Sequence, residues 1–153
     1  MKFFLAAFLS FSLVSCSLLS KYRKTAFTYT SGGKSFSIPI LVPKGYTRER
    51  TEVDSSGNTR LEYFYGGKTY FYVAHLEDTT ALLLPIAEDA NIPHVSRTGA
   101  LIYKGQDAEQ LFWREIRKGD LRVGYRYVPV SREARFDSAT NFAAFRPLGR
   151  KGQ

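Results

Sequence analysis

Hydrophobic and polar residues alternate along much of the chain between residues 27 and 128. A period of two places apolar side chains on one side of an extended strand and polar side chains on the other. Glycine, proline, asparagine and aspartate separate the alternating stretches, which is typical of antiparallel strands joined by turns. The expected strands cover residues 27–30, 36–42, 46–53, 60–65, 68–73, 100–104, 111–117 and 121–128.

The clearest hairpin surrounds Gly66-Gly67, which is typical of a two-residue turn. This turn pairs Tyr63 with Tyr70, Tyr65 with Lys68, and Leu61 with Tyr72. The same register places Ala74 and Leu76 on the tyrosine side, and we expect that side to face the core. Because aromatic rings also stack on flat ligands, a candidate ligand or partner face consists of Tyr63, Tyr65, Tyr70 and Tyr72.

A second hairpin joins residues 111–117 to residues 121–128, and two turn positions compete. A turn at Lys118-Gly119 places Arg117 opposite Asp120. A turn at Gly119-Asp120 instead places Arg117 opposite Arg122, and like charges directly opposite each other are destabilising. We therefore expect the first turn.

The chain ends in an expected helix over residues 132–145, with Ser131 as its N-cap. Its apolar stripe comprises Phe136, Ala139, Phe142 and Ala143. The elements together predict an α+β domain: a single curved antiparallel sheet of about seven or eight strands with one C-terminal helix packed on it. The alternative is a small closed β-barrel with a capping helix.

Residues 1–16 have the order of a secretory signal, with Lys2 before an apolar run over residues 3–14. The run ends at Cys16, the only cysteine. Leu13-Val14-Ser15-Cys16 resembles the lipobox of bacterial lipoproteins. The resemblance implies cleavage between Ser15 and Cys16, diacylglycerol on the thiol and a fatty acid such as palmitate on the new amine.

Two other interpretations of this segment remain open. Cys16 could lie beyond a conventional cleavage site, or residues 3–19 could stay uncleaved as a short membrane helix. Ser17 is not the aspartate that retains such lipoproteins in the inner membrane. The resemblance therefore implies an anchor in the outer membrane facing the periplasm, with the inner (cytoplasmic) membrane as the alternative.

Positive charge is concentrated at the two ends of the chain, outside the expected domain. The net charge is +8, but residues 25–145 contain 15 basic and 14 acidic residues, so the excess lies in the ends. Basic residues beside a lipid anchor attract anionic head groups, and we expect no nucleic-acid partner. The expected parts are a signal peptide (1–15), a lipidated basic tether (16–24), one α+β domain (25–146) and a basic tail (147–153).

Neither histidine, His75 or His94, lies in a catalytic motif, and the sequence indicates no cofactor. We therefore expect a non-enzymatic module that binds an envelope protein or a small ligand. The alternative is a hydrolase or metal-dependent enzyme that uses Glu88, Asp89 and His94, although their spacing matches no known metal site.

A second resemblance concerns the C-terminal part of the expected domain. Its segments are Trp113-Arg114-Glu115-Ile116, Val123-Gly124-Tyr125 and Phe136-Asp137. They resemble the tail region of small bacterial envelope lipoproteins that have no assigned chemistry. The resemblance covers about a quarter of the chain and implies the envelope location without a reaction.

Overall fold

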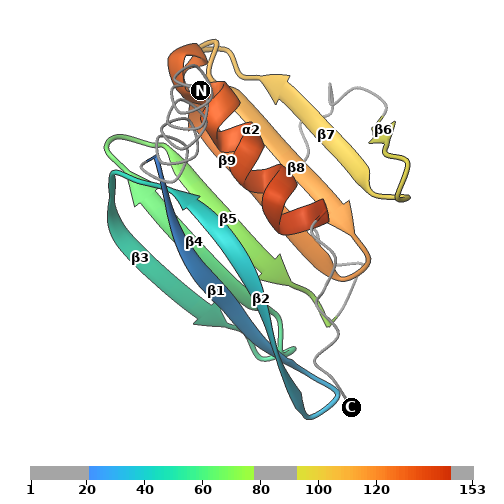
Figure 1. The fold of residues 1–153 in the computed structure, drawn as a ribbon. Helices are drawn as coiled ribbons and strands as arrows, with labels where there is room; N and C mark the ends of the chain where they lie inside the picture. Colours follow the sequence, from blue (N-terminus) through green and yellow to red (C-terminus); the bar gives the residue numbers. More distant parts are fainter. Residues whose placement is uncertain (1–20, 78–92, 146–153) are drawn as a thin grey trace, which may run out of the picture.

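The computed structural model describes residues 21–77 and 93–145, which form an α+β fold (Figure 1). Within these ranges the strands form a two-stranded and a seven-stranded antiparallel sheet. The larger sheet is open and has the order β3-β4-β5-β9-β8-β7-β6. The elements are β1 (Tyr22–Ser31), β2 (Lys34–Pro43), β3 (Tyr46–Val53), β4 (Thr59–Tyr65), β5 (Tyr70–His75), β6 (His94–Val95), β7 (Leu101–Gln106), β8 (Phe112–Lys118), β9 (Leu121–Val128) and α2 (Val130–Phe145).

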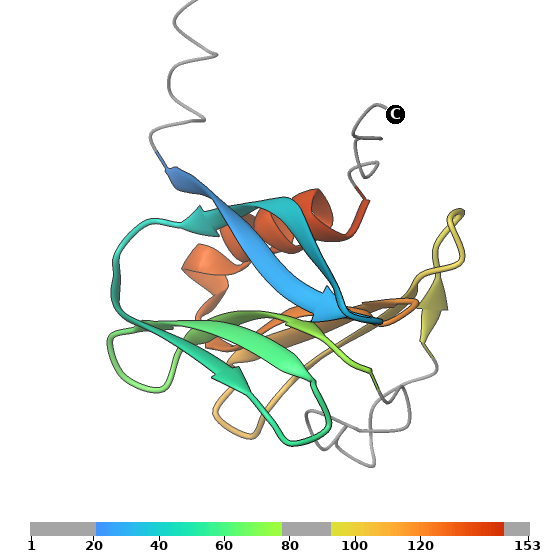
Figure 2. The same cartoon turned by 90° about the horizontal axis from the view of Figure 1, so that it is seen from below.

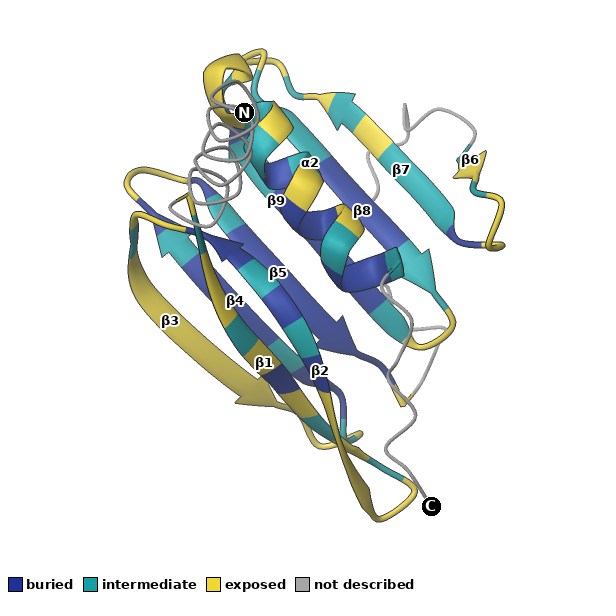
Figure 3. Cartoon of the chain, viewed as in Figure 1, coloured by how far each residue is buried: buried dark blue, intermediate teal, exposed yellow. Residues whose placement is uncertain are grey.

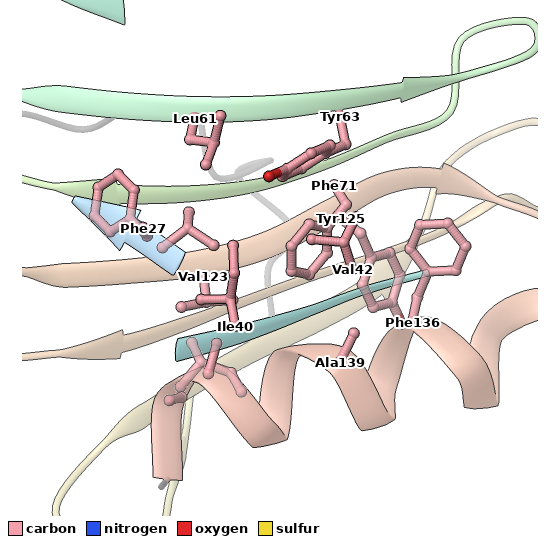
Figure 4. Packing of buried hydrophobic residues seen from close by; sticks show 14 of the residues in the cluster. Phe27, Ile40, Val42, Leu61, Tyr63, Phe71, Val123, Tyr125, Phe136 and Ala139 are labelled. Atoms are coloured by element: carbon pink, nitrogen blue, oxygen red, sulfur yellow. The ribbon is translucent and has the colours of Figure 1, made fainter. Parts of the chain in front are cut away.

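The helix and the β1–β2 hairpin cover the same side of the seven-stranded sheet (Figures 1 and 2). Buried residues concentrate where these layers meet (Figure 3). Ile40 and Val42 from β2 pack in one cluster with Phe71 and Val123 from the sheet and with Phe136 from α2 (Figure 4). The predicted α+β class with one C-terminal helix is therefore confirmed, and the sheet does not close into a barrel.

The expected single sheet is divided into two. Strands β1 and β2 pair only with each other and form a second layer over the larger sheet. Their buried side, which includes Phe27, Ile38 and Ile40, contacts the core through side chains. Because β1 begins at Tyr22, the expected tether of residues 16–24 overlaps the folded domain.

The predicted register of the Gly66-Gly67 hairpin is wrong by one residue. The backbone N–H of Tyr65 donates to the Thr69 carbonyl at 2.9 Å, which closes a three-residue loop. Gly67, inside this loop, has a φ of 74°, a left-handed conformation that glycine adopts without steric cost. Consequently Tyr63 lies opposite Phe71, and Tyr70 lies opposite Phe64 on the other side of the sheet.

The second hairpin turns at Gly119-Asp120, so the prediction of a turn at Lys118-Gly119 is wrong. Lys118 pairs with Leu121, so the loop is Gly119-Asp120 and Arg117 lies opposite Arg122. Gly119, the first loop residue, has a φ of 54°, as a type II′ turn requires. This register pairs Ile116 with Val123, both fully buried, and an ion pair between Arg117 and Glu115 offsets part of the repulsion between the arginines.

Helix α2 begins at Val130, so Ser131 lies inside the helix and is not its N-cap. Phe136, Ala139 and Ala143 are buried as predicted, while Phe142 is only half-buried. Polar bonds also attach the helix to the sheet. The Asp137 carboxylate accepts from the Tyr125 hydroxyl at 2.8 Å and contacts the Arg114 guanidinium at 2.9 Å.

None of the helical segments within residues 21–77 and 93–145 is long and apolar enough to cross a membrane.

Candidate functional site

The side of the seven-stranded sheet opposite α2 is rich in arginine. Directly paired residues of an antiparallel sheet share a side, so the register places nine charged residues of the described strands here. They are Arg48, Arg50, Arg60, Arg117, Arg122, Arg126, Glu52, Glu62 and Glu115. We call this side the arginine face. Helix α2 and the β1–β2 hairpin both lie on the other side (Figure 2).

Glu62 anchors one half of the arginine face. Its side chain is 2% exposed, and Arg50 on β3 donates to its Oε2 from Nε at 2.8 Å and from Nη2 at 2.5 Å. Arg60 on the same strand contacts Oε1. A buried carboxylate is stable only when its charge is compensated, so Glu62 holds two arginines in fixed positions.

Glu115 has the equivalent role in the other half. Its side chain is 5% exposed and forms an ion pair with Arg117 at 2.5 Å. The Tyr72 hydroxyl donates to the second oxygen of Glu115 at 2.6 Å. Tyr72 lies on β5 and Glu115 on β8, so the tyrosine spans the intervening strand β9. It does so directly over Gly124, the residue opposite both Tyr72 and Glu115.

Aromatic rings lie between the arginines. The Arg48 guanidinium lies 4.2 Å from the centre of the Phe64 ring, and the Arg117 guanidinium lies 4.5 Å from that of Tyr103. Trp113 lies across Gly105, where an added Cβ would approach the indole to 2.9 Å. The two guanidinium–ring distances are in the range of cation–π contacts, which orient the arginines without neutralising them.

Burial and neighbouring charges both act on the titratable groups of this face. Burial, and after it the carboxylate of Glu115, raises the pKa of Tyr72 well above its usual value, so the phenol stays protonated and acts as a donor. Burial, and after it the positive charge of Arg117, lowers the pKa of Arg122. The second shift thus has burial as its main cause and the neighbouring cation as the next.

The structure does not bring the four predicted tyrosines together on one face. Tyr63 and Tyr65 lie in the core between the sheet and the covering layer, whereas Tyr70 and Tyr72 lie on the arginine face. Tyr72 is 1% exposed and engaged with Glu115, which leaves Tyr70 as the partly exposed member. The one-residue shift of the hairpin is the reason, because it moves every side chain of β5 to the other side.

The remaining predicted residues are dispersed. His94 is exposed in β6 and pairs with Ile102, while Glu88 and Asp89 lie outside the described residues. Residues 21–77 and 93–145 contain no group of three or more His, Cys, Asp or Glu side chains that could hold a metal ion. The proposed cleavage and lipidation site at Ser15 and Cys16 also lies outside the described residues.

Sequence reasoning missed the arginine face, although a signal was present. Arg48 and Arg50 on one strand, and Arg122 and Arg126 on another, are separated by even numbers of residues and therefore share a side. The near balance of charge in residues 25–145 concealed this segregation, because many of the acidic residues lie elsewhere.

Comparisons with known proteins identify no relative: no family model, curated protein or solved structure matches the chain significantly.

Proposed function

We propose that this chain is a lipid-anchored bacterial envelope protein that binds an acidic protein through its arginine face and catalyses no reaction. The observation that carries the proposal is the excess of arginines over glutamates on that face, with aromatic rings between them. Anchoring rests on the lipobox resemblance of residues 13–16 and has the outer membrane, on its periplasmic side, as the proposed location.

The basic residues at one end of the domain are compatible with a nearby anionic membrane. The Lys44 backbone N–H donates to the Lys21 carbonyl at 3.0 Å, and the Tyr22 hydroxyl donates to the Arg135 carbonyl at 3.2 Å. These bonds bring the start of β1, the β2–β3 turn and the first half of α2 to the same end. Exposed Lys21, Lys24 and Lys44 gather there, and each basic residue near an anionic surface contributes on the order of 1 kcal/mol.

An acidic protein suits this face for two physical reasons. The opposed cations Arg117 and Arg122 repel each other even though Glu115 pairs with Arg117, and a further carboxylate beside them would relieve that repulsion. The planar guanidinium also forms paired hydrogen bonds with carboxylates. Arginine, tyrosine and tryptophan are the residues that contribute most to protein–protein binding, and the face contains all three, among them Arg48, Tyr70 and Trp113.

Site-specific photocrosslinking in intact cells tests the proposal. A benzoylphenylalanine in place of Tyr70 should crosslink to an envelope protein whose contacting segment, identified by mass spectrometry, is rich in Asp and Glu. The same probe in place of Phe36, which is exposed on β2 away from the face, should not form this product.

Charge reversal provides the matched comparison. Arg48→Glu should reduce the product at least about tenfold, since like charges across an interface cost several kcal/mol. Arg132→Glu makes the same charge change on exposed helix surface and should leave the yield unchanged. Equal yields in both variants, or a partner segment without acidic residues, would overturn the proposal.

A further inference from the structure

A cavity of about 160 Å³ lies on the covered side of the domain, between the end of the sheet, the β1–β2 hairpin and the last turn of α2. Its lining residues are Tyr29, Ile38, His75, Lys118, Asp120, Leu121, Ala143 and Ala144. We call it the His75 pocket. We propose that it binds a small zwitterion with an apolar side chain, of the class of the apolar α-amino acids.

The walls and the volume indicate the apolar part of the ligand. Ile38, Leu121, Ala143 and Ala144 contribute only aliphatic surface. A cavity of about 150 Å³ with such walls holds one benzene molecule. The pocket therefore accommodates a side chain of four to seven carbons, as in leucine or phenylalanine.

The polar groups of the pocket carry opposite charges. Lys118 donates one N–H of its ammonium to the Ala144 carbonyl at 3.0 Å, which leaves two N–H groups for a ligand. Asp120 is exposed at the turn between β8 and β9. Asp120 lines the pocket with Tyr29, and burial, followed by the negative charge of Asp120, raises the pKa of the Tyr29 phenol.

His75 and Tyr29 form the aromatic wall of the pocket. His75 is 4% exposed, and its ring stacks on Tyr29 with centroids 4.1 Å apart and an interplanar angle of 15°. Its Nδ1 is buried and has no hydrogen-bond partner. A buried polar atom without a partner costs about 1–3 kcal/mol, so the stacked His75 ring is held in the wall of the pocket at a cost to stability.

A zwitterion matches both charges at once. Its carboxylate meets the free N–H groups of Lys118, and its ammonium meets Asp120 and the C-terminal end of α2, where the helix dipole favours a cation. A simple carboxylate or a simple amine satisfies only one of these groups. The pocket lies on the opposite side of the sheet from the arginine face. Zwitterion binding here could therefore be disproved without affecting the proposed binding of an acidic protein, and the reverse also holds.

Calorimetric titration of the purified full-length protein in a non-ionic detergent tests the ligand class with three probes. L-Leucine should bind with a saturable heat. Both 4-methylpentanoate, which lacks the ammonium, and 3-methylbutylamine, which lacks the carboxylate, should bind at least about tenfold more weakly, the factor expected for one charge-assisted hydrogen bond. No saturable heat with millimolar L-leucine, or equal affinity for the three probes, would overturn the proposal.

Two variants locate the binding in the pocket. Ala143→Leu fills the cavity and should lower the affinity for L-leucine at least about tenfold, whereas Ala134→Leu on the exposed side of the same helix should not. Lys118→Met should weaken L-leucine and 4-methylpentanoate but leave 3-methylbutylamine unchanged. Equal weakening of all three probes in a Lys118→Met variant that keeps the wild-type urea melt would overturn the role of Lys118 in recognition.

Discussion

At the scale of single residues, Gly124 allows the Tyr72 hydroxyl to bond Glu115 across strand β9 on the arginine face. A Cβ at this position would collide with the Tyr72 hydroxyl and with the backbone carbonyl of Arg114. Only a residue without a side chain lets the Tyr72 ring cross β9 and reach Glu115. Glycine weakens a strand interior, and here that cost is offset by a buried hydrogen bond to a carboxylate.

We expect Gly124→Ala to lower the free energy of unfolding by about 2–4 kcal/mol, because it adds overpacking to the loss of a charge-assisted hydrogen bond. Urea denaturation followed by the fluorescence of Trp113, the single tryptophan, measures the change. Gly66→Ala is the control, since a Cβ there meets nothing within 4 Å, and it should change stability by less than about 0.5 kcal/mol. Similar losses in both variants would contradict the role given to Gly124.

At the scale of elements, α2 is held by one aromatic side chain and by polar bonds at its flanks. Phe136 is fully buried and meets the rings of Tyr65 and Tyr125 edge-on, with centroids 5.0 and 5.6 Å apart. Short helices gain most of their stability from such docking. The Lys118 bond to Ala144 attaches the last turn and also shapes the wall of the His75 pocket.

Phe136→Ala should therefore lower the free energy of unfolding by roughly 3–5 kcal/mol, as for other buried phenylalanines. Arg132→Ala, on the exposed side of α2, should change it by less than about 0.5 kcal/mol. The same fluorescence-detected urea melts compare the two variants. If Phe136→Ala proved as mild as Arg132→Ala, the helix would not be a structural part of the core.

At the scale of the whole molecule, the proposed anchor would hold the domain close to the membrane. Five peptide links separate Cys16 from Lys21, and an extended chain of that length spans at most about 18 Å. The basic end of the domain begins directly after this segment with Lys21 and Lys24. A single acyl chain binds membranes only weakly, so stable attachment needs the several chains that the lipobox resemblance implies.

Cys16→Ala should abolish incorporation of labelled palmitate and release the protein from the membrane fraction or leave an unprocessed precursor. Ser17→Ala, one residue further along, should retain the label and the membrane location. Metabolic labelling followed by membrane fractionation measures both properties. Wild-type protein that takes up no labelled fatty acid would refute the anchor.

The sequence by itself determined the helix and every described strand except the two-residue strand β6. Local alternation is sufficient for that purpose, because backbone geometry makes side chains alternate in a strand whatever it pairs with. The expected ranges near residues 46–53, 60–65 and 121–128 accordingly match β3, β4 and β9. The α+β class followed from the order of these elements.

Only the tertiary structure decided which side chains meet, because each register depended on a shift of one or two residues in the pairing. A shift of one residue exchanges the two sides of a strand, and it moved Tyr72 from the expected core to the arginine face. The pairing of Arg117 with Arg122 is accompanied by an ion pair between Arg117 and the buried Glu115, which a rule on directly opposed charges omits. Both candidate sites are built across strands, so neither the arginine face nor the His75 pocket is a continuous feature of the sequence.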